Sequence, residues 1–336
     1  MLPRVSVFSL GGTIAMGATS PGKGVSLSHS VEMLIDAVPA LADIAAIEAH
    51  SFRQLPSPDI TLVDLEALAR EINSRLDDGV RGIVVTQGTD TLEESAFVID
   101  RLVQHVAPVV FTGAMRNPTM PSPDGPANLF HAVLVALAQE ARGIGTLLVM
   151  NDEIHAARYV QKLHTTSPAA FHSSPAGAIG WIIEKQARIV TRPGGRFPVA
   201  LPSAPKPARV ARLTVGLDED GTLVDLALQA GYNGMVIDVT GGGHVPKAMV
   251  EALGRAAGRI PVVYASRTRH GETMQATYDF PGAETDLLQR GLIPAGWLGG
   301  IKARLLLALL LRAGAGREEI GEVFENWRDP FAHPPR

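Results

Sequence analysis

The sequence predicts an α/β protein with a large N-terminal domain, built on a doubly wound and mainly parallel sheet, and a smaller C-terminal α/β domain. From residue 4 to about residue 150, apolar runs of strand length alternate with longer amphipathic stretches. The runs are continuous in Val, Ile and Leu, which is typical of strands buried on both faces of a parallel sheet. A stretch rich in Pro and Gly then separates this region from a second α/β pattern.

The expected elements follow from these runs in chain order. GIVVT illustrates the strands and LVDLEALAREINSRL the amphipathic helices. The expected strands are 4–10, 82–86, 107–113 and 145–150, with helices at 30–38, 62–76, 94–103 and 128–141. Residues 151–190 indicate irregular or antiparallel structure, and the second domain adds strands at 235–243 and 261–267 and helices at 299–314 and 317–327. The predicted organisation is a catalytic domain at 1–190, a linker at 191–209 and a C-terminal domain at 210–336.

Composition excludes several classes of protein. The 336 residues are 46% hydrophobic and 19% charged, with a formal net charge of -4, so no surface is basic enough for nucleic acid. There is no cysteine, which excludes disulfides, Cys-ligated zinc and a cysteine nucleophile. The N-terminus runs into the first strand without an apolar signal region, so we expect a cytoplasmic protein. The apolar run 301–311 is too short to span a bilayer and indicates a core or interface helix.

The run VTQGTDTLEES, residues 85–95, places Thr89 and Asp90 at a strand-to-helix turn. Such turns lie at the carboxyl edge of a parallel sheet, where ligand crevices form. Asp90 with Glu93, or Thr91 with Glu94, also has capping-box spacing, which would make these residues only a helix start. The segment VFSLGGTIA repeats the arrangement with Thr13, which is either a turn residue or part of one site shared with Thr89.

A hydroxyl nucleophile needs a base to accept its proton and a third group to orient that base. Lys162, in VQKLHTTS, is a candidate base because a buried lysine can lose its proton near neutral pH, and Asp90 could hold it in place. The alternative is an ordinary surface lysine. Three histidines, at 155, 164 and 172, match no helical pair of metal ligands, so we expect no metal site. The turn-rich segment 115–129 is either a connection or a wall of the site.

Taken together, these segments resemble the bacterial-type L-asparaginase family, also called the asparaginase and glutaminase-asparaginase family. The matching runs are GGTIA at 11–15, QGTDTLEES at 87–95, TGAMR at 112–116, SPDGPANL at 122–129 and VMNDEIHAARYVQK at 149–162. The resemblance covers essentially the whole chain. It implies a hydrolase that converts the side-chain amide of L-asparagine to L-aspartate and ammonia, without a metal or organic cofactor.

The resemblance also implies the catalytic roles. Thr13 resembles the nucleophile that forms a β-aspartyl ester. Thr89, Asp90 and Lys162 resemble the family's second triad, in which the lysine deprotonates a threonine or the water and the aspartate meets the substrate's α-amino group. This chemistry is consistent with an amide, which needs an attacking oxygen, proton transfer to ammonia and donors for the oxyanion.

Substrate binding is implied for a second set of residues. Ser57 matches the serine that binds the α-carboxylate, and Gly88 is expected to bind substrate as well. Backbone N–H groups near Thr89 and at Ala114 would supply oxyanion donors. The likeness implies a homo-oligomer, a dimer or a tetramer of close dimers, in which a neighbouring subunit contributes to each site. The counterparts of those contributed residues are His244 and Tyr278.

Three departures from the family pattern bear on function. The loop 16–28 contains no tyrosine, Pro58 follows the substrate-binding serine, and His244 and Tyr278 stand where relatives carry asparagine and glutamate. The reaction class is unchanged by these differences, but affinity and amide preference are affected. The alternatives are therefore a hydrolase of another amide, such as L-glutamine or an N-substituted asparagine, and an amino-acid sensor that turns its ligand over slowly.

Overall fold

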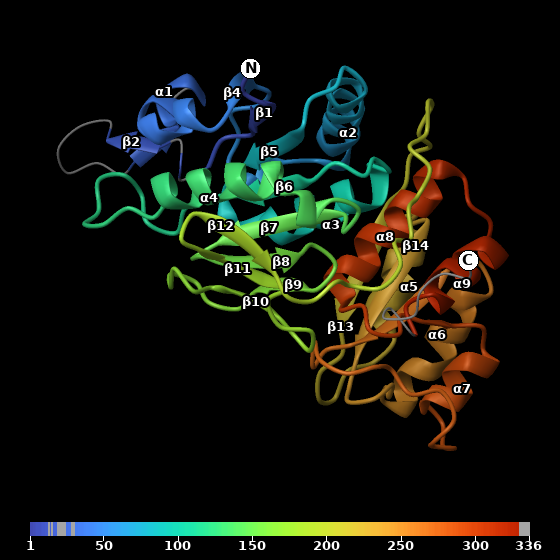
Figure 1. The fold of residues 1–336 in the computed structure, drawn as a ribbon. Helices are drawn as coiled ribbons and strands as arrows, with labels where there is room; N and C mark the ends of the chain where they lie inside the picture. The colour runs from blue at the N-terminus through green and yellow to red at the C-terminus, as the bar shows by residue number, and fades with distance from the viewer. Residues whose placement is uncertain (13, 15, 19–24, 28–30, 329–336) are drawn as a thin grey trace. The chain divides into compact units, whose positions relative to one another are not determined.

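The structure is a computed structural model that describes residues 1–12, 14, 16–18, 25–27 and 31–328. It divides into two compact units, Met1–Pro198 and Val199–Arg336 (Figure 1). Each unit contains a mainly or wholly parallel sheet with helices packed against it. The predicted fold class, a large doubly wound domain followed by a smaller α/β domain, is confirmed.

The first unit is built on an eight-stranded sheet in the order β12-β11-β8-β7-β6-β5-β1-β4. Five neighbouring strands, from β7 to β4, are parallel, and the three at the other edge are antiparallel. The strands are β1 (Arg4–Ser9), β4 (Ala46–Ser51), β5 (Gly82–Thr86), β6 (Val109–Thr112), β7 (Thr146–Met150), β8 (Glu153–Ala156), β11 (Gly180–Ile183) and β12 (Gln186–Ile189). The expected strands are all present, whereas β4 was not predicted.

The helices of this unit lie close to their expected positions. They are α1 (Val31–Asp36), α2 (Leu62–Asp77), α3 (Leu92–Leu102) and α4 (Gly125–Leu137), with short 3-10 turns at Pro39–Asp43, Ser57–Asp59, Thr89–Thr91 and Gln139–Ala141. Helix α2 begins with a capping box, in which the Thr61 hydroxyl accepts the Asp64 N–H and the Asp64 side chain accepts the Thr61 N–H. Helix α4 begins three residues earlier than expected, with a proline in its first turn.

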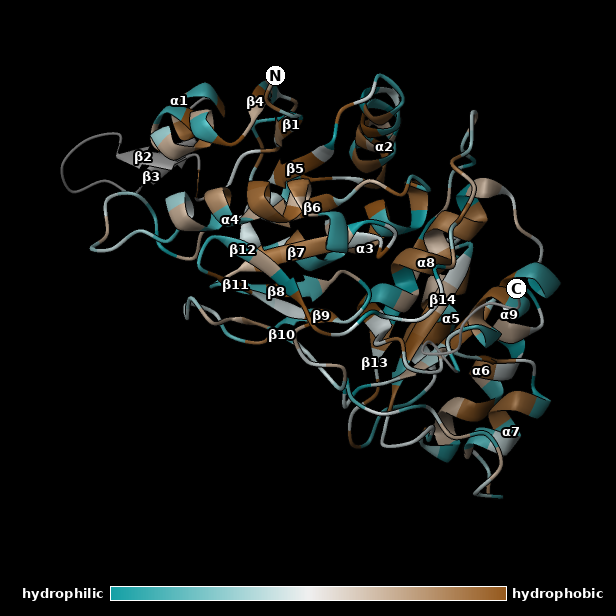
Figure 2. Cartoon of the chain, in the orientation of Figure 1, coloured by the Kyte–Doolittle hydropathy of each residue, from teal (hydrophilic) through white to brown (hydrophobic). Residues whose placement is uncertain are grey.

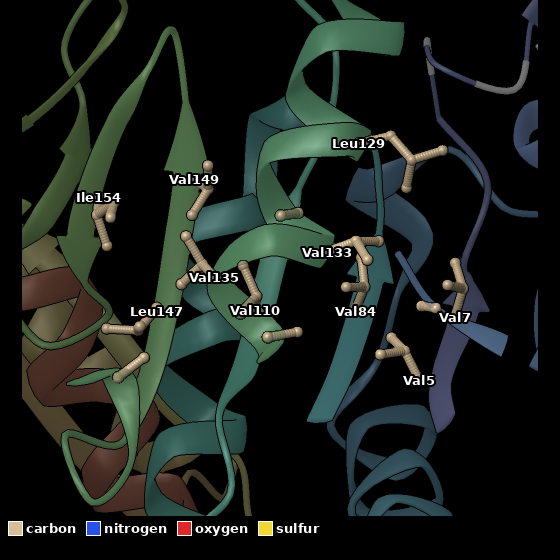
Figure 3. Close-up of a cluster of buried hydrophobic side chains, with 14 of the residues drawn as sticks. Val5, Val7, Val84, Val110, Leu129, Val133, Val135, Leu147, Val149 and Ile154 are labelled. Carbon is tan, nitrogen blue, oxygen red and sulfur yellow. The ribbon is translucent and has the colours of Figure 1, made fainter. Parts of the chain in front are cut away.

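The core of the first unit lies between α4 and one face of the sheet. Strand residues such as Val5, Val84, Val110 and Leu147 belong to one cluster with Val133 of α4 (Figure 3). All five side chains are buried. Helices α2 and α3 pack against each other, and α3 contacts β6 and β7. Figure 2 shows hydrophobic residues along β7 and α4.

Residues 151–190 contain short antiparallel strands, one of the two alternatives expected for this segment. Besides the edge strands β8, β11 and β12, they form a separate two-stranded sheet of β9 (Val160–Lys162) and β10 (Phe171–Ser173). A second small antiparallel pair, β2 (Met16–Ala18) and β3 (Val25–Leu27), follows the first strand of the chain.

The second unit has a four-stranded parallel sheet in the order β13-β14-β15-β16. Its elements are β13 (Val210–Thr214), α5 (Thr222–Gln229), β14 (Gly234–Val239), α6 (Val250–Ala257), β15 (Val262–Ser266), α7 (Glu284–Gln289), β16 (Ile293–Pro294), α8 (Gly300–Ala313) and α9 (Arg317–Glu325). The leucine-rich helix α8 packs on β13, β14 and β15, which makes it a core helix. Among the described residues, no helix has the length and apolarity that crossing a membrane requires.

The Pro- and Gly-rich stretch, residues 191–209, lies between β12 and β13 and is fully described. It contains no helix or strand. Its first residues are nevertheless fixed to the first unit. Arg101 donates to the Phe197 carbonyl at 2.9 Å, and Arg158 donates to the Gly194 carbonyl at 2.8 Å. The division of the chain into two compact units falls between residues 198 and 199. The linker boundaries predicted at residues 190 and 210 stay a prediction.

The buried carboxylate of Asp100 balances the positive charges of the arginines that bind residues 194–197. Asp100 is 1% exposed, forms an ion pair with fully buried Arg101, and accepts the Thr146 N–H at 2.8 Å. Burial alone would raise the pKa of Asp100, yet Arg101, Arg158, Arg196 and the Thr146 N–H hold this pKa below its ordinary value. The carboxylate is therefore charged at neutral pH.

We predict that Asp100→Asn lowers the free energy of unfolding by roughly 3–5 kcal/mol, because it removes a buried negative charge that interacts with Arg101, Arg158 and Arg196. Urea denaturation measures the loss. The control is Asp77→Asn at the exposed end of α2, which should lie within about 0.5 kcal/mol of the unmodified protein. Equal stability of the two variants would contradict this role for Asp100.

Candidate functional site

The candidate site is assembled at the carboxyl edge of the first sheet. Strands β1, β5 and β6 are parallel neighbours, with Ser9 in register with Thr86, and Thr86 in register with Thr112. The segments that follow these strands therefore leave the sheet side by side. They carry Gly11 and Gly12 after β1, the run 87–91 after β5, and the run 113–116 after β6. Three matching segments of the sequence are brought to one edge in this way.

Thr89 and Asp90 lie in the 3-10 turn between β5 and α3. Thr89 is buried, with 7% exposure. The capping-box alternative for this turn is wrong for Thr91, the N-cap of α3, because Thr91 makes no side-chain capping hydrogen bond. Its hydroxyl instead donates to the Ser57 carbonyl at 2.7 Å and accepts from Gln87 Nε2 at 3.1 Å. The turn is thus tied to the segment that carries Ser57.

Lys162 reaches this turn from the separate β9–β10 hairpin. Its ammonium donates to Thr89 Oγ1 at 2.9 Å and to Asp90 Oδ1 at 2.6 Å. The lysine side chain is only 13% exposed, whereas that of Asp90 is 69% exposed. The surface-lysine alternative therefore fails, and the structure brings together the lysine, threonine and aspartate that the sequence singled out. The sequence spacing suggested only a capping role for Glu93, but its side chain accepts the backbone N–H of Lys162.

The two glycine–threonine segments meet backbone to backbone. A Cβ atom on Gly12, whose φ is +91°, would lie 2.0 Å from the backbone nitrogen of Gly88. A Cβ atom on Gly88 would lie 3.0 Å from Ser57 Oγ. Gly88 therefore lies against both Gly12 and Ser57, and only glycine permits the approach of Gly12. Thr13, the predicted nucleophile, and most of the loop 16–28 lie outside the described residues.

The segment after β6 lies beside the Thr89 turn at Gly113. A wall formed by residues 115–129 stays a prediction. A Cβ atom on Gly113 would lie 2.6 Å from the Gln87 carbonyl and 3.3 Å from Thr89 Cγ2. The Gly113 carbonyl accepts from Asn128 Nδ2 at 3.0 Å, which anchors this segment to α4. Ala114, the other proposed oxyanion donor, is 1% exposed. Asp124 then accepts the N–H groups of the two residues that follow Ala114.

His244 and Tyr278 both lie in the second unit and contact each other. Their rings meet edge to face, with centroids 4.9 Å apart. The buried Glu284 connects them, because its Oε2 lies 3.2 Å from His244 Nε2 and its Oε1 accepts the N–H of Tyr278 at 2.7 Å. Burial would raise the pKa of Glu284, but the backbone N–H groups and His244 hold it below its ordinary value. Nothing in the local sequence distinguishes Glu284 from an ordinary helix-start carboxylate.

Comparison with known proteins assigns the family. A family model described as "Asparaginase, N-terminal" matches residues 4–194, and one described as "Glutaminase/Asparaginase C-terminal domain" matches residues 209–324. The chain belongs to the asparaginase family. The expected resemblance is confirmed over both units.

Several asparaginases are similar to this chain along nearly their whole length. A "Probable L-asparaginase" of Deinococcus radiodurans is 38% identical over 331 residues, covering 96% of this chain and 97% of that protein. A "Probable L-asparaginase periplasmic" of Haemophilus influenzae is 34% identical over 336 residues, covering 97% and 93%. A crystal structure titled "Probable Cytoplasmic L-asparaginase" from Campylobacter jejuni aligns with a TM-score of 0.87 at 29% identity, covering 96% and 99%.

In this asparaginase-family chain, a buried histidine supports the strand pair that carries Lys162. His155 Nδ1 lies 3.0 Å from Ser173 Oγ on β10, and His155 Nε2 lies 3.2 Å from Glu153 Oε2. Of the other two histidines considered as metal ligands, His164 accepts the N–H groups of Thr166 and Ser167, and His172 lies exposed on β10. Among the described residues, no three or more His, Cys, Asp or Glu side chains form a group that could hold a metal ion.

We predict that His155 makes this chain less stable in mild acid. Burial, with a smaller contribution from His172, lowers the pKa of His155 from 6.5 to about 4. The unfolded chain binds a proton at His155 below about pH 6.5, whereas the folded chain does so only below about pH 4. The free energy of unfolding should therefore fall as pH decreases through this window, by roughly 3 kcal/mol in total.

Urea denaturation of the unmodified protein and of His155→Gln at several pH values from 7 to 4 measures this contribution. Glutamine does not titrate, so the variant should lose stability less steeply than the unmodified protein across the window. The same slope in both proteins would assign the acid sensitivity to another group.

Proposed function

We propose that this chain hydrolyses the side-chain amide of L-asparagine to L-aspartate and ammonia through a threonine ester. Family membership over both units and the printed names of its relatives support this activity. The observation that carries the proposal is the contact of Lys162 with Thr89 and Asp90 at the carboxyl edge of the sheet. A binding protein has no need of a lysine directed at a buried threonine hydroxyl.

The proposed reaction has two steps. The Thr13 hydroxyl attacks the amide carbon and gives up its proton to a base of the site. That proton is passed to the amide nitrogen as the C–N bond breaks, and ammonia leaves. Water, oriented by Thr89 and losing its proton to the Thr89–Lys162 pair, then cleaves the β-aspartyl ester and regenerates the threonine. These steps use only side chains, backbone groups and water. At 2.9 Å, Lys162 Nζ is within proton-transfer distance of the Thr89 hydroxyl.

Substrate binding is proposed for the groups around this triad. Asp90 holds Lys162 through Oδ1, and its largely exposed carboxylate is free to meet the substrate's α-ammonium group. Ser57 binds the α-carboxylate beside Gly88, which it contacts. Backbone N–H groups near Thr89 and Ala114 stabilise the oxyanion. In each of these assignments, a donor or acceptor of the protein is paired with a substrate group of complementary chemistry.

We also propose that the protein assembles as a homo-oligomer, a dimer or a tetramer of close dimers. His244 and Tyr278 of one subunit would then contact the substrate bound by its neighbour. Two observations support this proposal: the rings of His244 and Tyr278 contact each other, and Tyr278 is 43% exposed in the second unit. The compartment stays a prediction: cytoplasmic is expected, and the names of the relatives include both a periplasmic and a cytoplasmic enzyme.

Ammonia release from purified protein tests the activity and its selectivity. L-Asparagine, L-glutamine and an N-substituted asparagine are each varied from micromolar to tens of millimolar, with amine release followed for the last. Saturable turnover of asparagine above that of the other two supports the proposal. Preferential turnover of another amide would reassign the substrate, and binding of asparagine without turnover would indicate a sensor.

We expect Thr89→Val and Lys162→Met each to lower kcat by a factor on the order of a hundred to ten thousand, because each removes one proton-transfer group at similar volume. The fold should persist, as judged by thermal unfolding. Lys185→Met, on the exposed turn between β11 and β12, is the matched control and should retain the kcat of the unmodified protein. Most of the activity surviving in either site variant would show that the triad is wrongly assigned.

Tyr278→Phe tests the contribution of the second unit. If the hydroxyl contacts the neighbouring subunit's substrate, its removal should raise KM about three- to thirty-fold, with a smaller change in kcat. The control is Tyr232→Phe, since Tyr232 precedes β14 and so lies at the opposite end of that strand from His244. A KM equal in the two variants would remove Tyr278 from the site.

A further inference from the structure

The backbone N–H of Lys162 takes no part in the pairing of β9 with β10. In the β9–β10 pair, the Leu163 N–H donates to the Ala170 carbonyl. Alternate residues of an antiparallel strand direct their N–H groups to opposite edges. The N–H of Lys162 therefore points away from β10, toward the side on which β9 contacts α3. Glu93 of α3 accepts this N–H with Oε2.

We propose that Glu93 is a positioning residue for Lys162, acting on the lysine backbone while Thr89 and Asp90 hold the ammonium. This inference rests on the proposed role of Lys162 as the base. Residues 89–93 form one continuous turn and helix start, so a single segment holds both ends of the lysine. The strand β9 is thereby fixed relative to the same residues that its lysine must reach.

The hairpin needs such an attachment because it does not belong to the eight-stranded sheet. Among the described strands, β9 and β10 pair only with each other, while β10 contacts β8 and β9 contacts α3. His155 of β8 holds β10 through Ser173, and Glu93 holds β9 through Lys162. Glu93 is 8% exposed, so water is a poor substitute for its carboxylate. Removing the acceptor leaves the N–H of Lys162 without this partner and releases one strand of the hairpin.

A small displacement of β9 is sufficient to change catalysis. Proton transfer requires heavy atoms about 2.6–3.2 Å apart, and Lys162 Nζ lies 2.9 Å from Thr89 Oγ1. Misplacement of a catalytic group lowers the rate of proton transfer more than it lowers the affinity for substrate. Loss of Glu93 should therefore act on kcat more than on KM.

The test compares Glu93→Met, which keeps the side-chain length, with Glu93→Gln, which keeps an acceptor oxygen. Glu94→Met is the matched control on the next residue of α3. We expect Glu93→Met to lower kcat for L-asparagine about ten- to a hundred-fold, with KM changed less than about three-fold. Glu93→Gln should recover most of this loss in kcat. Glu94→Met should retain the kcat of the unmodified protein. In a Lys162→Met background, Glu93→Met should lower the residual turnover no further. Unchanged kcat in Glu93→Met, or an equal loss in Glu94→Met, overturns the proposal.

Amide hydrogen exchange gives a second readout that needs no activity. Glu93→Met should speed exchange at the Lys162 N–H, while exchange in β7 stays unchanged and the Glu94→Met protein matches the unmodified one. Should Glu93→Met not fold, the Glu93→Gln protein is measured instead, and its weaker acceptor should give a smaller increase at the same amide. No change at that amide overturns the positioning role. If the unmodified protein releases no ammonia but the exchange result holds, the proposed function fails while the contact between Glu93 and Lys162 stands.

Discussion

The contact of the Lys162 ammonium with Thr89 and Asp90 is the interaction on which the site depends. Lys162 comes from a separate hairpin, more than 70 residues along the chain from the turn that it meets. A largely buried ammonium requires compensating partners, and here they are one hydroxyl and one carboxylate. The two partners differ in exposure, because the Asp90 side chain is 69% exposed and Thr89 is buried.

Close backbone contacts set the dimensions of the site around this interaction. Gly12 approaches Gly88, and Gly113 approaches Gln87, so that any Cβ atom at either glycine would clash with the neighbouring segment. Parallel strands end at the same edge, and glycine allows the segments that follow them to pack without intervening side chains. These segments are therefore held close together, and one of them carries Thr89 and Asp90.

Local patterns were sufficient to predict most of the first unit from the sequence. The buried Val-rich strands and amphipathic helices carry their own periodicity, and the strand-end position of Thr89 followed directly from it. Strand β4 was missed because AIEAHS mixes polar and apolar residues at a half-buried edge of the sheet. In the second unit, the short helices α5, α6 and α7 were not predicted, since segments of six to eight residues provide few periods to recognise.

The contacts that were missed are non-local. Glu93 was weighed only as a capping residue, because nothing near it in the sequence reveals a lysine N–H 69 residues away. Glu284 links His244 and Tyr278 through contacts made only after folding. The resemblance to known enzymes identified the chemical groups, whereas the structure supplied the residues that hold them.

The most direct test of this account is to trap the covalent intermediate. Protein turning over L-asparagine is quenched in acid, digested, and mapped by mass spectrometry for a β-aspartyl ester. The account predicts the ester on the peptide that contains Thr13, and its absence from Thr13→Ala. An ester on Thr89 would contradict the assignment of nucleophile and base, and steady turnover by Thr13→Ala would contradict the threonine mechanism as a whole.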